Sequence, residues 1–173
     1  MRLHLIDTNA ELANAWQRDF ADMPDVFVSA GNILECAENT IVSPANGYGL
    51  MDGGIDEQYT DFFGDTPQRR IQDIIARRPE GILPVGAAVL VETGHSRIPY
   101  MISAPTMVDP QPVGPENAFR AMSATLRTVS RHTDKVTDLY CPGLGTGIGR
   151  IPPDDASREM AAAYRKWVHQ ATE

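Results

Sequence analysis

The stretch IVSPANGYGLMDGGID, from Ile41 to Asp56, leaves an apolar strand through Pro-Ala-Asn and then gathers glycines and aspartates within a few residues. A plain surface loop has no need of this combination. Glycine lets the main chain approach a ligand closely, and Asn46 offers both a donor and an acceptor to sugar hydroxyls. The stretch therefore predicts a ligand-binding loop that follows a buried strand.

A second glycine-rich stretch, CPGLGTGIGRIPPDD, runs from Cys141 to Asp155. Glycines occupy every second position from Gly143 to Gly149, so successive amides can turn toward one point, and such a nest binds phosphate oxygens. A helix that starts near Pro153 would add the positive end of its dipole. A flexible turn is the alternative interpretation. The spacing fits neither a dinucleotide-binding fingerprint nor a P-loop.

The hydrophobic pattern predicts that strands and helices alternate along most of the chain. Strands are expected at residues 2–6, 26–28, 40–42, 87–92, 100–104 and 139–141. Helices are expected after a capping box at residues 8–11 in which Thr8 accepts from the amide of Glu11, at residues 66–78, and from Pro115 and Pro152 onward. This order predicts an α/β fold with a largely parallel or mixed sheet. Because ligands bind beyond the carboxyl ends of such strands, both glycine-rich loops should lie at one edge.

Composition limits the classes of function. The chain has 173 residues, 42% of them hydrophobic, and we expect one domain over residues 1–173. The net charge is −8, and the local basic pairs Arg69-Arg70 and Arg77-Arg78 fit a solvated helix face, so nucleic-acid binding is disfavoured. No apolar run approaches the roughly 20 residues that span a bilayer, and the N-terminus does not resemble a signal peptide.

The cysteines and histidines indicate the cellular compartment and whether a metal site is expected. Two widely separated cysteines, Cys36 and Cys141, predict a reducing compartment and hence a soluble cytoplasmic protein. The histidines lie in no spacing typical of a zinc site. We therefore expect no metal and no cofactor, and no interaction with membranes.

Four motifs resemble the macro-domain family, whose members bind ADP-ribose, and the resemblance covers nearly the whole chain. The matching segments are VSAGNI at 28–33, SPAN at 43–46, LMDGGID at 50–56 and GTGIGRIP at 145–152. Ser43, Asp52 and Ile148 depart from the family pattern. The resemblance implies a three-layer α/β/α fold with a central mixed sheet.

The resemblance also implies where each part of ADP-ribose would bind. The adenine would lie at Asn32 and Ile33, and the distal ribose at Asn46. The chain would pass beside that ribose and the diphosphate at Gly53, Gly54 and Ile55. The diphosphate would rest on Gly145, Thr146, Gly147, Ile148 and Gly149.

Asp56 has two interpretations. Its place at the start of a short helix favours a structural N-cap. The resemblance instead implies that Asp56 orients or deprotonates a water near the anomeric carbon, so that Asp56 and Asn46 become the candidate catalytic residues. The function implied is hydrolysis of ADP-ribose from mono-ADP-ribosylated acceptors with an ester-type linkage, the partner being ADP-ribose or an ADP-ribosylated protein. The alternatives are a non-enzymatic reader, or a hydrolase of ADP-ribose phosphate or O-acetyl-ADP-ribose. The sequence predicts no oligomeric state.

Overall fold

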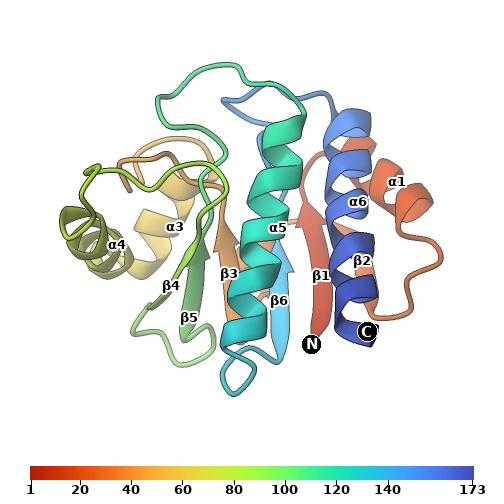
Figure 1. Ribbon diagram of the computed structural model, residues 1–173, viewed down its shortest axis with the longest axis horizontal. Coiled ribbons are helices and arrows are strands. Elements are labelled where there is room, and N and C mark those ends of the chain that lie inside the picture. The colour runs from red at the N-terminus through yellow and green to blue at the C-terminus, as the bar shows by residue number, and fades with distance from the viewer.

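A computed structural model describes all of residues 1–173, and helices cover both faces of a central sheet (Figure 1). The elements are β1 (Arg2–Asp7), α1 (Ala10–Asp19), β2 (Val26–Ala30), α2 (Ile33–Cys36), β3 (Thr40–Ser43), α3 (Ile55–Phe63), α4 (Thr66–Ala76), β4 (Val89–Glu92), β5 (Tyr100–Ser103), α5 (Glu116–Arg131), β6 (Asp138–Cys141) and α6 (Pro153–Thr172). The predicted three-layer α/β/α fold is confirmed.

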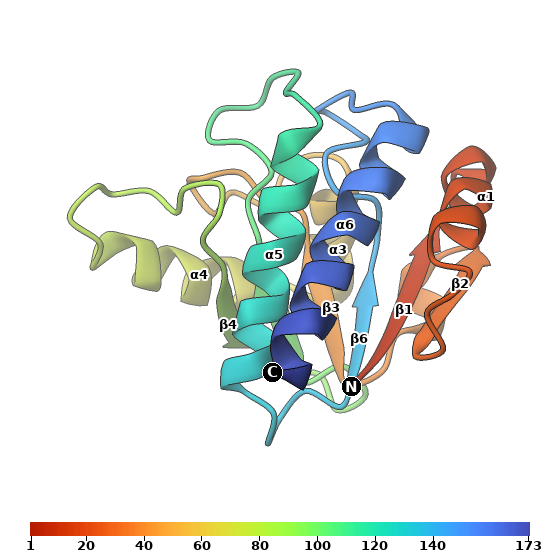
Figure 2. The ribbon, with the colours of Figure 1, turned by 45° about the vertical axis from the view of Figure 1, so that its right-hand side comes forward.

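The sheet is mixed, with strand order β2-β1-β6-β3-β5-β4. Every neighbouring pair is parallel except β4 and β5, which are antiparallel. The parallel strands therefore end at one edge. Figures 1 and 2 both show the loops that follow β5 and β6 at that edge, above the upper ends of the strands.

Two apolar cores hold the layers together. On one face, α1, α5 and α6 pack on the sheet through buried side chains such as Trp16, Met122 and Met160. On the other face, α3 and α4 pack through Tyr59 and Ile71. Each of these side chains recurs at helical spacing with other apolar residues, and burying one contributes about 1.5–3 kcal/mol. The cores therefore fix the strands whose ends carry the loops.

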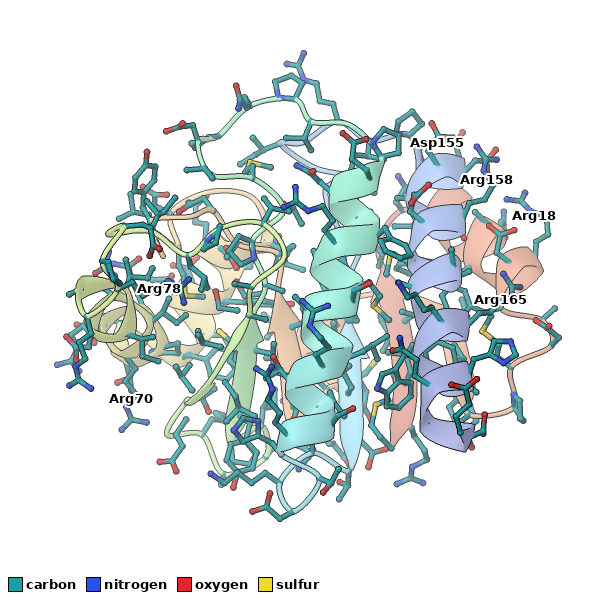
Figure 3. All side chains as sticks on the ribbon, in the orientation of Figure 1. Arg18, Arg70, Arg78, Asp155, Arg158 and Arg165 are labelled. Atoms are coloured by element: carbon teal, nitrogen blue, oxygen red, sulfur yellow. The ribbon has the colours of Figure 1, made fainter.

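An ion pair and a hydrogen bond add polar contacts between α1 and α6. Arg18 approaches Asp154 at 3.4 Å, and the Nη2 of Arg165 donates to the carbonyl oxygen of Asp19 at 2.7 Å. Figure 3 shows Arg18 and Arg165 on the side of the molecule where these two helices meet. Such exposed pairs contribute at most about 1 kcal/mol each, so the apolar core dominates this contact.

The structure corrects two local expectations. Asn9, not Thr8, is the N-cap of α1, because its Oδ1 accepts from the amides of Glu11 and Leu12. The helical turn α2 was not expected, and Asn32 caps it by accepting from the amide of Leu34 at 3.0 Å. None of the helices combines the length and the apolar character needed to cross a membrane.

Candidate functional site

A cleft of about 340 Å³ opens at the carboxyl edge of the sheet. The cleft is lined by residues at the ends of β1, β2, β3, β5 and β6 and in the loops that follow them, so both glycine-rich loops meet there. The sequence-predicted site residues that line it are Asn32, Ile33, Asn46, Gly53, Gly54, Ile55, Asp56, Gly145, Thr146, Gly147, Ile148 and Gly149. No lysine, arginine or histidine is part of the lining.

Asn46 organises the first loop. Its Oδ1 accepts from the amides of Tyr48 and Leu50, at 3.0 and 3.3 Å, and its Nδ2 donates to the carbonyl oxygen of Leu50 at 2.9 Å. Tyr48 in turn donates from its hydroxyl to Asp109 at 2.7 Å. The side chain of Asn46 therefore rigidifies its own turn, and one amide hydrogen is left to face a ligand.

The two glycine-rich loops touch at Gly53. A Cβ at this position would lie 3.3 Å from the Cδ1 of Ile148, closer than an ordinary contact. Gly54 follows with φ of 60° and is the N-cap residue of α3, with no side chain capping the helix. The first amides of α3 belong to Ile55 and Asp56, which line the cleft, and they have no partner within the helix. Glycine favours the positive φ that precedes them.

The second loop is held in shape from within. The amide of Gly143 donates to Oδ2 of Asp7 at 2.9 Å, and the amide of Ile151 donates to the carbonyl oxygen of Gly145 at 2.9 Å. A Cβ at Gly149 would lie 2.6 Å from that same carbonyl oxygen. The loop thus closes on itself, and glycine is required at position 149, where the main chain passes close to the carbonyl oxygen of Gly145.

The main-chain amides inside this loop are free. None of the N–H groups of residues 144–149 donates to a protein acceptor, although Gly145 and Gly149 are buried. Buried amides in proteins are nearly always paired. Unpaired amides in a glycine-rich turn are the donors from which proteins build anion-binding concavities. The residues that line the cleft do not include the N-terminus of α6, and a contribution from the dipole of this helix stays a prediction.

Asp56 lies in the first turn of α3 and is 5% exposed. It is not the N-cap; its Oδ1 accepts a hydrogen bond of 2.6 Å from the hydroxyl of Ser43. Burial raises the pKa of the Asp56 carboxyl to about 7, against the opposing effect of the Ser43 hydrogen bond and with an added rise from the charge of Asp52. Near neutral pH this side chain can both take up and release a proton.

Two cleft residues were not anticipated from the sequence. Asp7 accepts from the amides of Asn9 and Gly143 and so joins the end of β1 to the second loop. Thr106 lines the cleft and its buried hydroxyl has no partner. Asp7 ends a parallel strand at the same edge as the predicted loops, and this signal was available in the sequence. No group of three or more histidine, cysteine or acidic side chains is arranged to hold a metal ion.

The fold and the cleft define an α/β/α protein with a glycine-rich cleft at the carboxyl edge of a mixed sheet. The family model described as Macro domain matches residues 42–160, and the chain therefore belongs to the macro domain family. This confirms the resemblance found in the sequence.

Relatives support the same family. An uncharacterized protein of Aquifex aeolicus is 33% identical over 150 residues, which are 86% of each chain. A macro domain-containing protein of Listeria monocytogenes is 26% identical and aligns over 84% of this chain and 82% of its own length.

Solved structures share the fold. The macrodomain of Mycobacterium tuberculosis DarG has a TM-score of 0.67 at 19% identity and covers 80% of this chain and 88% of its own. The Oceanobacillus iheyensis macrodomain with ADP has a TM-score of 0.68 at 20% identity and covers 81% of this chain and 74% of its own. At these identities the comparison concerns the fold.

Proposed function

We propose that the cleft binds ADP-ribose. The observation that carries the proposal is the set of free main-chain amides at residues 144–149, which offers donors to a diphosphate in a cleft without basic side chains. Related folds give the ligand class: the Oceanobacillus iheyensis macrodomain was solved with ADP and, as a variant, with ADPR, and a Trypanosoma brucei macrodomain with ADP.

In the proposed pose the diphosphate lies on residues 145–149 and the first amides of α3. The adenine lies at Asn32 and Ile33. The side-chain oxygen Oδ1 of Asn32 already caps α2, and its side-chain Nδ2 is free to donate. The distal ribose lies between Asn46 and Ile148, and the exposed Ile148 side chain covers it.

We further propose that this protein hydrolyses ADP-ribose from mono-ADP-ribosylated acceptors linked through an ester. A water oxygen attacks the anomeric carbon of the distal ribose, Asp56 takes up the water proton, and the bond to the acceptor oxygen breaks to release a carboxylate. A base with a pKa near the working pH serves this step well and contributes about 10²–10⁴-fold. The bound diphosphate adds rate by fixing the reacting geometry.

The test compares binding with turnover in the Asp56→Asn variant. We expect ADP-ribose affinity, measured by calorimetry, to change by less than about threefold, whereas release of ADP-ribose from an ester-linked acceptor falls by at least about 10²-fold. The Asp52→Asn variant, which removes a cleft carboxylate of the same loop, is the control and keeps most of the activity. Undiminished turnover in Asp56→Asn contradicts the role of Asp56.

The same assay separates the alternatives. Binding without turnover of protein-linked, acetylated or phosphorylated ADP-ribose identifies a reader, a role that the deep burial of Asp56 and its bond to Ser43 would also suit. Turnover of the small esters alone identifies a metabolite hydrolase. The free Cys36 and Cys141 support the further proposal of a cytoplasmic protein. We also propose that the chain acts as one domain and that its partner is an ADP-ribosylated protein.

A further inference from the structure

A second hollow, of about 310 Å³, runs along α5 and α6 and shares no residue with the cleft. We call it the α5–α6 groove; its walls include Phe119, Arg120, Arg127, Lys166 and Trp167. Figure 1 shows the two helices side by side in front of the sheet. Three cations line this groove and no carboxylate does, on a chain whose net charge is −8.

The two guanidinium groups are fixed but not neutralised. Arg120 donates from Nη2 to the carbonyl oxygen of Val85 at 2.9 Å, and Arg127 donates from Nη2 to that of Gly86 at 2.7 Å. A carbonyl oxygen orients a guanidinium without cancelling its charge, and each arginine keeps further N–H donors. Both arginines lie on one helix, two turns and therefore about 10 Å apart, and both are exposed.

An apolar surface adjoins these charges. Phe119 and Trp167 are only partly buried and pack against the core with one side. The Nε1 of Trp167 donates to the hydroxyl of Ser130 at 2.8 Å, which holds the indole in place. Rigid aromatic side chains beside arginine are the residue types that concentrate binding energy at interfaces.

We propose that the α5–α6 groove docks a short acidic segment of a partner protein. Two or three carboxylates of the segment bind Arg120, Arg127 and Lys166, and an apolar side chain between them rests on Trp167. Three cations line the groove on a chain whose net charge is −8, so a short acidic segment matches it, whereas an extended nucleic-acid strand would also meet the acidic side chains elsewhere on the chain. This inference concerns a surface separate from the cleft and does not depend on the proposed function.

The probe is a ten-residue peptide that alternates aspartate or glutamate with leucine. Trp16 is fully buried, so changes in tryptophan fluorescence on titration report on Trp167. We expect saturable binding that weakens as salt rises from 50 to 500 mM, because exposed charges are screened. The same peptide with asparagine and glutamine in place of the acids should not bind, and a ten-nucleotide oligothymidine should bind more weakly than the acidic peptide.

The matched variants are R120Q/R127Q and R77Q/R131Q, which remove the same number of charges inside and outside the groove; Arg77 and Arg131 are exposed and do not line it. We expect about tenfold weaker peptide binding in the first variant and no change in the second. If thermal melting shows that R120Q/R127Q is unfolded, K166Q replaces it with an expected loss of about threefold. Equal loss in both variants, tighter binding of the oligonucleotide, or no saturable binding at 50 mM salt overturns the proposal.

Discussion

The hydroxyl of Ser43, the last residue of β3, donates a hydrogen bond of 2.6 Å to the Asp56 carboxylate in the first turn of α3. Both side chains are buried. A hydrogen bond to the charged form of a carboxyl lowers its pKa, whereas burial raises it. The hydrogen bond thus joins β3, which precedes the first loop, to α3, which follows it. It also keeps the pKa of Asp56 at about 7, below the value that burial alone would give.

Removing the hydroxyl of Ser43 should shift the pH dependence of the proposed hydrolysis. In Ser43→Ala the Asp56 carboxylate loses its donor, so its pKa rises by about one unit. Activity needs the ionised form of Asp56. As the pH is lowered, activity is therefore lost at a higher pH than in the parent chain, and the acid limb of the kcat/KM profile shifts to higher pH. Ser103→Ala is the control, because Ser103 pairs with Ser43 in register and its buried hydroxyl has no partner. An unmoved acid limb in Ser43→Ala would show that the bond does not tune Asp56.

Asp56 should also make stability depend on pH. Its folded pKa is about 7 and its ordinary value 3.8, so the folded state binds the proton more tightly between these values. The free energy of unfolding therefore falls as pH rises from about 4 to about 7. The size of the shift corresponds to about 4 kcal/mol. Asp56→Asn should be more stable than the parent chain at pH 8 and similar near pH 4, as urea denaturation will measure. Parallel pH curves for the two chains are the contrary result.

Two glycines of the second loop should respond differently to an added methyl group. A Cβ at Gly149 would lie 2.6 Å from the carbonyl oxygen of Gly145, whereas a Cβ at Gly147 meets nothing within 4 Å. Gly149→Ala should therefore cost about 1–3 kcal/mol and lower the Tm by roughly 3–9 °C, because each kcal/mol corresponds to about 3 °C in a chain of this length. Gly147→Ala should melt within about 2 °C of the parent chain. Equal melting of the two variants would contradict the described course of the loop.

The architecture was predictable because apolar periodicity and capping signals are local. The alternation of strands and helices, and the rule that ligands bind at the carboxyl edge, sufficed to bring both glycine-rich loops together. Side-chain partners were not predictable. The bond between Ser43 and Asp56, and the bond between Asp7 and Gly143, depend on register and on how each loop closes.

Longer-range features were also beyond the sequence. The amide of Ile151 donates to the carbonyl oxygen of Gly145, so the second loop closes before α6 begins at Pro153, and this closure depends on contacts that the sequence does not show. The α5–α6 groove is invisible in the sequence for a similar reason. Arg120 and Lys166 belong to separate helices, and only the packing of those helices brings their charges to one groove.

The most direct measurement of the central claim is a calorimetric comparison of ADP-ribose, ADP, AMP and NAD on the same preparation, supported by thermal shifts, since a ligand bound only by the folded chain raises the Tm. If the free amides of residues 144–149 hold a diphosphate, ADP-ribose binds most tightly and AMP at least about tenfold more weakly than ADP. Binding of AMP as tight as that of ADP-ribose, or no binding of any of the four, would contradict the account.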